Sequence, residues 1–236
     1  MHDREFLKKV EHLGIGVFGV SDIARITGKD RGYACLFAKR LKNRGLIKSV
    51  EKGRYVFPDT DPLIVASNLV HPSYISFLSG LAYYHRTTQI PVETQVVYSK
   101  SKKSVKYDDS TISFVKLRKE RVFGYRREKL GNGFTFVGEI EKVIVDALFL
   151  PRHCPVSETF NALKEGVDVE KIINYALRMN SIVTLKRLGY LLDLTDIDVY
   201  DKLKKHINVR YDTLSPNVLR KGEKNRKWCL LINEVV

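Results

Sequence analysis

The side chains best suited to chemistry in this sequence are cations placed along one short stretch, residues 29–54. Guanidinium and ammonium groups donate hydrogen bonds to phosphate oxygens, and arginine also pairs with the edge of guanine. We expect the first of these cations to lie on the outer face of a helix and the last of them at the tip of the hairpin that follows it. A duplex nucleic acid is therefore the ligand class that this stretch favours. The candidate contact residues are Lys29, Arg31, Tyr33, Arg40, Lys52 and Arg54.

Two helices are expected to position these cations. Ser21 is the predicted N-cap of a short helix over residues 22–27, and Gly28 suits the left-handed residue that ends such a helix. A second helix is predicted over residues 30–44 and ends at Gly45. Apolar residues recur there at intervals of three and four residues, so we expect them to form one buried stripe along the helix. That stripe consists of Ala34, Phe37, Ala38 and Leu41.

A β-hairpin is predicted after the second helix, because two short apolar runs flank Gly53. An opening helix over residues 4–13 would complete a three-helix core. Helix, helix, hairpin in this order predicts a winged helix-turn-helix domain over residues 1–57, whose second helix fits the major groove. The alternative is a small helical domain with a solvated basic face.

Composition limits the protein class. The chain has 236 residues, 44% of them hydrophobic, and no apolar run approaches the ~20 residues that span a membrane. No secretion signal precedes the first helix, so a cytoplasmic protein without membrane contact is expected. Cys35, Cys154 and Cys229 lack the spacing of a disulfide framework or a zinc site. We therefore expect no metal and no cofactor.

The net charge of +14 is concentrated in two regions. Residues 1–57 and residues 100–129 each carry a net charge of +7, and the remaining residues balance. The second region has three interpretations: a longer DNA footprint, an RNA-binding surface, or a solubilising rim. Its candidate residues form a second basic patch of Lys100, Lys102, Lys103, Arg126 and Arg127.

The rest of the chain predicts a second domain. Pro58 and Pro62 interrupt the pattern, so residues 58–70 are expected to be a linker that includes a short apolar helix. Residues 71–236 then read as strands between 92 and 137, followed by helices from 139 onward. The predicted fold class is α+β: an N-terminal winged helix-turn-helix followed by a mixed α/β domain, sheet first and helices after.

Catalytic residues are harder to identify, and we expect no enzyme. Two sets of residues, Glu93 with Lys100, and Asp108 and Asp109 with Lys116 and Arg118, faintly resemble the site of a metal-dependent nuclease. Such enzymes need several carboxylates that converge on a cation. A nuclease is therefore kept as a minor alternative.

Five matches, the first of them in two parts, give the chain a resemblance to the AbiEi family of antitoxins, the transcriptional regulators of type IV toxin–antitoxin (abortive infection) systems. The resemblance covers most of the chain, although Ile140 and Lys142 depart from the family pattern. The segments are residues 41–47, 52–55, 74–84, 137–148, 187–192 and 228–233.

The resemblance implies a function that the residues alone do not. The winged helix would bind inverted repeats in double-stranded operator DNA and repress the protein's own operon. The C-terminal domain would counteract a nucleotidyltransferase-like toxin, with or without stable contact. The alternative is a regulator of other genes whose second domain senses a ligand or partner.

Overall fold

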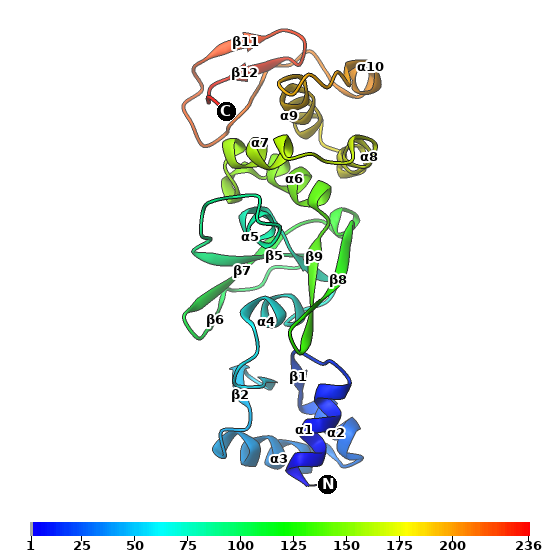
Figure 1. Ribbon diagram of the computed structural model, residues 1–236, viewed down its shortest axis with the longest axis vertical. Coiled ribbons are helices and arrows are strands. Elements are labelled where there is room, and N and C mark those ends of the chain that lie inside the picture. Colours follow the sequence, from blue (N-terminus) through cyan, green and yellow to red (C-terminus); the bar gives the residue numbers. More distant parts are fainter. Residues whose placement is uncertain (1) are drawn as a thin grey trace. The chain divides into compact units, whose positions relative to one another are not determined.

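The computed structural model describes residues 2–236, and their contacts form two compact units, each described by itself below (Figure 1). The N-terminal unit comprises residues 2–75, 92–117 and 126–137, and the C-terminal unit comprises residues 76–91, 118–125 and 138–236. Both units contain helices and strands, so the predicted α+β class is confirmed. No helix within residues 2–236 has both the length and the apolar character required to cross a bilayer.

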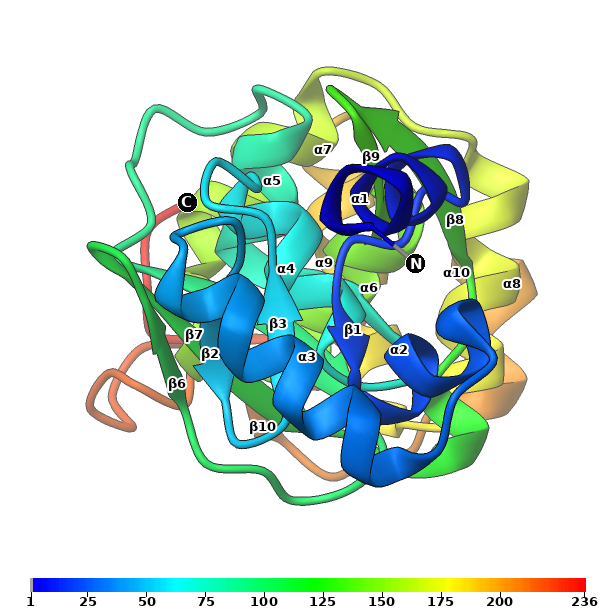
Figure 2. The same cartoon turned by 90° about the horizontal axis from the view of Figure 1, so that it is seen from below.

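The N-terminal unit begins with three helices and a hairpin, in the predicted order (Figure 2). Its three-stranded sheet has the order β1-β3-β2, because β3 pairs antiparallel with both neighbours. The elements are α1 Asp3–His12, β1 Phe18–Gly19, α2 Val20–Thr27, α3 Arg31–Asn43, β2 Lys48–Glu51 and β3 Arg54–Val56.

One apolar core holds these elements together. Phe6 of α1 meets Phe37 of α3 edge to face at 5.2 Å and Phe18 of β1 at 6.0 Å, which is the offset geometry that aromatic rings prefer. Ile23 of α2 and Ile47, just before β2, are buried in the same cluster. Helix α3 thus shares one buried core with α1, α2 and β1.

A six-stranded mixed sheet completes the N-terminal unit, in the order β6-β7-β5-β4-β9-β8. β5 pairs parallel with β7 over six residue pairs, and β4 pairs parallel with β9. Helix α4 (Pro62–Asn68) contacts β4 and β5. The strands are β4 Ser73–Ile75, β5 Glu93–Tyr98, β6 Val105–Tyr107, β7 Ser110–Lys116, β8 Tyr125–Leu130 and β9 Gly133–Gly138.

The C-terminal unit is a group of helices with a small sheet of order β10-β12-β11. Helix α6 is its centre, since it contacts α5, α7, α8 and α9. The helices are α5 Phe77–Tyr83, α6 Ile140–Phe149, α7 Val156–Lys164, α8 Val169–Met179, α9 Ile182–Asp193 and α10 Tyr200–Leu203. The strands are β10 Asp212–Thr213, β11 Glu223–Asn225 and β12 Leu230–Ile232.

Several local predictions need correction. Helix α2 begins at Val20, and the carboxylate of Asp22 accepts a hydrogen bond from the Gly19 N–H at 2.8 Å, so Ser21 is not the cap. The compact units also divide the chain differently from the predicted boundaries at residues 57 and 71. The predicted linker contains α4, which packs on the sheet, and most of that sheet clusters with the N-terminal helices.

The core of the C-terminal unit predicts a strong effect of one small substitution. A Cβ at Gly189 of α9 would lie 2.2 Å from the buried ring of Trp228, which also donates a hydrogen bond from Nε1 to Asp193 at 2.7 Å. We expect Gly189→Ala to lower the free energy of unfolding by about 1–3 kcal/mol, because neither group has room to move. Urea denaturation followed by the fluorescence of Trp228 measures the change. Asn174→Ala, at an exposed position on α8, is the control, and equal midpoints for the two variants would contradict the packing argument.

Candidate nucleic-acid interface

Helix α3 has well-defined ends, and both follow from its sequence. The carboxylate of Asp30 caps the first turn by accepting the N–H of Tyr33 at 2.9 Å. Gly28, with φ +67°, ends α2, and Gly45, with φ +68°, follows α3. Only residues 28–30 separate the two helices. The α2–α3 pair therefore has the short turn predicted for a helix-turn-helix.

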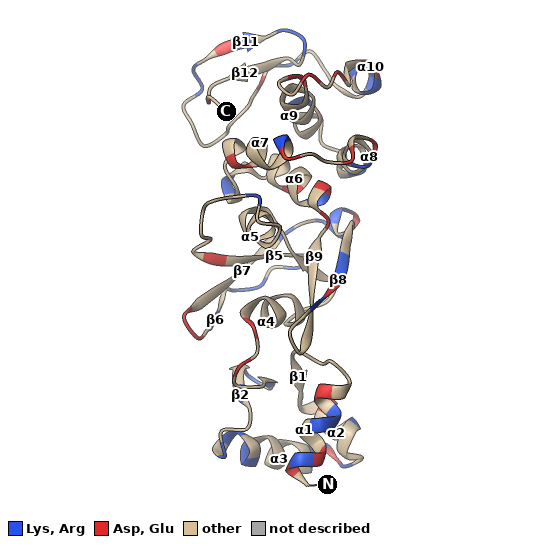
Figure 3. Ribbon diagram, in the orientation of Figure 1, with Lys and Arg blue, Asp and Glu red and all other residues tan. Residues whose placement is uncertain are grey.

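The predicted stripe of α3 is buried, and its cations are exposed. Ala34, Phe37, Ala38 and Leu41 are 0–2% exposed. On the outer side, Arg31 and Arg40 are exposed, as is Lys29 in the preceding turn. Figure 3 shows the basic positions along this helix. The helix thus buries its apolar stripe and leaves these cations exposed, together with Leu36.

Arg40 is held in place by its neighbours. Its guanidinium lies 4.8 Å from the centre of the Phe37 ring and 3.2 Å from the carboxylate of Asp3. Arg44, one turn later, pairs with the same carboxylate. Because Arg40 and Arg44 are more than half exposed, these ion pairs contribute little to stability, but they orient both guanidinium groups.

Tyr33 is half-buried rather than free. Its ring stacks on Phe37 at 5.7 Å, and it lines an open hollow of about 560 Å³ together with Arg40 and Arg44. His2, Asp3 and Arg4 form the other side of that hollow. Sequence reasoning missed Arg44, although its position four residues after Arg40 places the two on one helix face.

The two predicted wing residues differ in exposure. Lys52 is exposed at the tip of the hairpin, where Gly53 has φ +75°. Arg54 is half-buried and pairs in register with Gly19 of β1. Burial, together with the charge of Arg54, lowers the pKa of His71. Lys52 is therefore the better placed of the two to reach a ligand.

The loop between β5 and β6 lies beside the β2–β3 hairpin, the predicted wing. Lys102 Nζ donates to Glu51 of β2 at 2.6 Å, and Lys48 of β2 lies 3.2 Å from Asp108, in the turn after β6. Lys100 and Lys103, in the same loop, are exposed. The wing and this loop thus present cations side by side.

The predicted second basic patch is not one patch. The β5–β6 loop adjoins strand β6 at one edge of the six-stranded sheet, whereas Arg126 and Arg127 lie in β8 at the opposite edge. Arg126 pairs with Glu128, and the guanidinium of Arg127 lies 3.6 Å from the centre of the Phe134 ring. The sequence prediction grouped these residues by their charge along the chain, which contains no information on strand order.

The residues considered for nuclease chemistry do not converge. Glu93 begins β5, while Lys100 follows the end of that strand. Asp108 is paired with Lys48, and Lys116 ends β7. Within residues 2–236, no group of three His, Cys, Asp or Glu side chains is placed to hold a metal ion. The carboxylates and lysines considered for nuclease chemistry therefore do not share one site.

Two segments behind the family resemblance meet in a buried polar cluster. The hydroxyl of Ser76, which precedes α5, donates to Asp146 of α6 at 2.9 Å, and the Lys142 ammonium pairs with the same carboxylate. Lys142 and Asp146 are fully buried, and burial lowers the pKa of Lys142. These residues join α5 to α6 with no opening to solvent, so we interpret them as structural.

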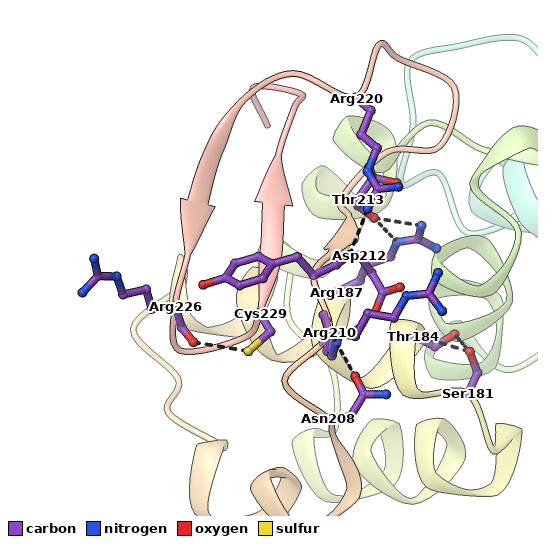
Figure 4. Close-up of polar contacts among 12 residues, drawn as sticks. Ser181, Thr184, Arg187, Asn208, Arg210, Asp212, Thr213, Arg220, Arg226 and Cys229 are labelled. Carbon is purple, nitrogen blue, oxygen red and sulfur yellow. Dashed lines mark hydrogen bonds and ion pairs between the residues drawn. The ribbon is translucent and has the colours of Figure 1, made fainter.

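A third such segment, together with Lys186 just before it, anchors residues 208–213. Lys186 of α9 is fully buried, and its ammonium donates to Asn208 Oδ1 at 2.8 Å, to Asp212 Oδ2 at 2.9 Å and to the Arg210 carbonyl. These bonds satisfy its three donors. Figure 4 shows the next residue, Arg187, turned toward Thr213, whose carbonyl accepts its Nη2 at 3.0 Å. Adjacent cations on one helix thus fix residues 208–213.

Comparison with known proteins identifies the fold alone. No protein-family model and no curated protein matches the sequence. The structure is similar to the crystal structure of the RV2827C protein from Mycobacterium tuberculosis, with a TM-score of 0.62 and 16% sequence identity. The match covers 95% of this chain and 89% of that chain, so the similarity includes both compact units.

Proposed function

We propose that this protein is a DNA-binding transcriptional repressor that places α3 in the major groove of double-stranded DNA. The observation that carries the proposal is the division of α3, whose apolar stripe is buried while Arg31 and Arg40 remain exposed. A second helix that follows a short turn and is flanked by a hairpin is the usual reading element of winged helix domains.

The cations would contact different parts of the DNA, depending on their position. Arg31 lies in the first turn of α3, the end that contacts base edges in helix-turn-helix proteins. Lys29, just before the helix, and Lys52, on the wing, are placed for the phosphate backbone, which fixes register without reading sequence. The loop lysines beside the wing would lengthen the backbone contact in that direction.

The identity of the operator and the second activity rest on the family resemblance. AbiEi-like proteins repress their own operon at inverted repeats and counteract a nucleotidyltransferase-like toxin. We propose both roles for this chain, with the antitoxin activity in the region after the winged helix.

The DNA-binding surface can be tested by removing two of its guanidinium groups. With promoter DNA of the protein's own operon, we expect a specific footprint, and we expect Arg31→Ala combined with Arg40→Ala to weaken binding about tenfold or more, since each arginine contact contributes about 1–3 kcal/mol. Titration by gel shift measures the affinity. Arg118→Ala with Lys119→Ala removes the same charge from exposed positions outside the N-terminal unit and serves as the control. Equal weakening by both pairs would contradict recognition by α3.

The two edges of the sheet should differ in their contribution to binding. Lys100→Gln with Lys103→Gln should reduce the slope of log affinity against log salt by about 1.8, because each lost phosphate contact removes about 0.9. Arg126→Gln with Arg127→Gln should leave the slope unchanged. Affinities measured across a range of salt concentrations give both slopes. An equal reduction by both pairs would place the opposite edge in the footprint as well.

The antitoxin role has its own test. The full-length chain, co-expressed with a neighbouring nucleotidyltransferase-like toxin, should restore the growth of the cells. The variant with Arg31→Ala and Arg40→Ala should still restore growth but should no longer repress the operon. The expectation follows because the DNA contacts and the proposed antitoxin region use different residues. Failure of the full-length chain to restore growth would refute this half of the proposal and leave the DNA-binding half intact.

A further inference from the structure

The C-terminal segment, residues 202–227, carries an excess of positive charge that averaging over longer stretches conceals. It contains nine Lys or Arg residues and two Asp or Glu residues, a net charge of +7. Three of its cations have acidic partners: Lys202 pairs with Glu170, Lys204 with Asp201, and Lys227 with Asp193.

The other six cations of the segment lack an acidic partner among residues 2–236. Of the two acidic residues in the segment, Asp212 is already engaged by Lys186. Six exposed cations form no ion pair with any acidic side chain in residues 2–236. Concentrated like charge of this kind is typical of a surface that meets a polyanion. These six are Lys205, Arg210, Arg220, Lys221, Lys224 and Arg226.

Tyr211 brings several of them together. Arg220 Nη2 donates to the Tyr211 carbonyl at 3.3 Å, and Lys224 Nζ lies 5.4 Å from the centre of the Tyr211 ring. Arg210, Tyr211, Val218 and Arg220 line a hollow of about 260 Å³. One aromatic residue, one aliphatic residue and two arginines thus line one hollow, together with Asp212, Thr213 and Pro216.

The backbone beneath this hollow is held firmly. The Arg210 carbonyl and the Asp212 carboxylate both accept from buried Lys186. The side chain of Arg210 itself is exposed. The loop that follows adds exposed apolar groups, with Leu219 83% and Val218 45% exposed. A fixed frame under cations and apolar groups suits a ligand that has both phosphates and flat rings.

We propose that this hollow and its surrounding cations bind single-stranded nucleic acid. Phosphates would contact Arg210, Arg220 and Lys224, and an unstacked base would lie against Tyr211 and Val218. A duplex would use the cations but has no free base face to offer an aromatic ring, which is why the aromatic and apolar components favour a single strand. The inference stands independently of DNA binding by α3, because it concerns only residues of the C-terminal unit.

The test uses the full-length chain carrying Arg31→Ala and Arg40→Ala, so that α3 contributes little. Binding of a labelled oligouridylate of about 20 nucleotides, longer than a typical single site, is followed by fluorescence anisotropy at low salt. Arg220→Gln with Lys224→Gln should weaken binding about tenfold, and Tyr211→Leu about fivefold through lost stacking. Arg118→Gln with Lys119→Gln, which removes equal charge elsewhere in the C-terminal unit, should change affinity less than about twofold.

Competition separates the possible ligands. An unlabelled single strand should displace the probe, and the better of oligouridylate and oligodeoxythymidylate identifies the sugar that the site prefers. Blunt duplex DNA or polyglutamate competing as well as the single strand would overturn the proposal in favour of general polyanion or acidic-protein binding. Equal loss in the charge control, or unchanged affinity of Tyr211→Leu with native Trp228 fluorescence, would overturn it too.

Discussion

The packing of α3 against the N-terminal core is the constraint on which the proposed DNA surface depends. Phe37 and Leu41 are buried among residues from α1, α2 and the strands, so rotation of α3 about its axis would expose them to water. Burial of such side chains is worth about 1.5–3 kcal/mol each, far more than any ion pair on the outer face. The apolar stripe therefore determines where Arg31 and Arg40 point.

The wing has a different kind of support. Ion pairs from Lys102 to Glu51 and from Lys48 to Asp108 join the hairpin to the β6 edge of the sheet. Partly exposed pairs of this type add under about 1 kcal/mol each. Their effect is geometric, since they align the β5–β6 loop with the hairpin and leave Lys100 and Lys103 exposed. A helical domain and a sheet thereby share one basic surface within the N-terminal unit.

Buried ions organise the C-terminal unit. Lys142 with Asp146, and Lys186 with Asp212, bury ammonium groups that water would otherwise solvate. Such pairs are poor sources of stability compared with apolar packing, but removal of one partner leaves a buried charge without compensation. Lys142, Asp146 and Lys186 belong to or adjoin the segments that resemble AbiEi proteins. The buried ions thus join α5 to α6 and α9 to residues 208–213.

Local sequence was sufficient for α3, because period, cap and terminating glycine all act within a few residues of one another. Asp30, Gly28 and Gly45 determined its ends, and the stripe determined its buried face. Strand order and tertiary side-chain pairs could not be predicted from the sequence, since they join residues tens of positions apart. Only the tertiary structure separated Arg127 from Lys103, paired Lys102 with Glu51 of the β2–β3 hairpin, and brought Arg220 to Tyr211.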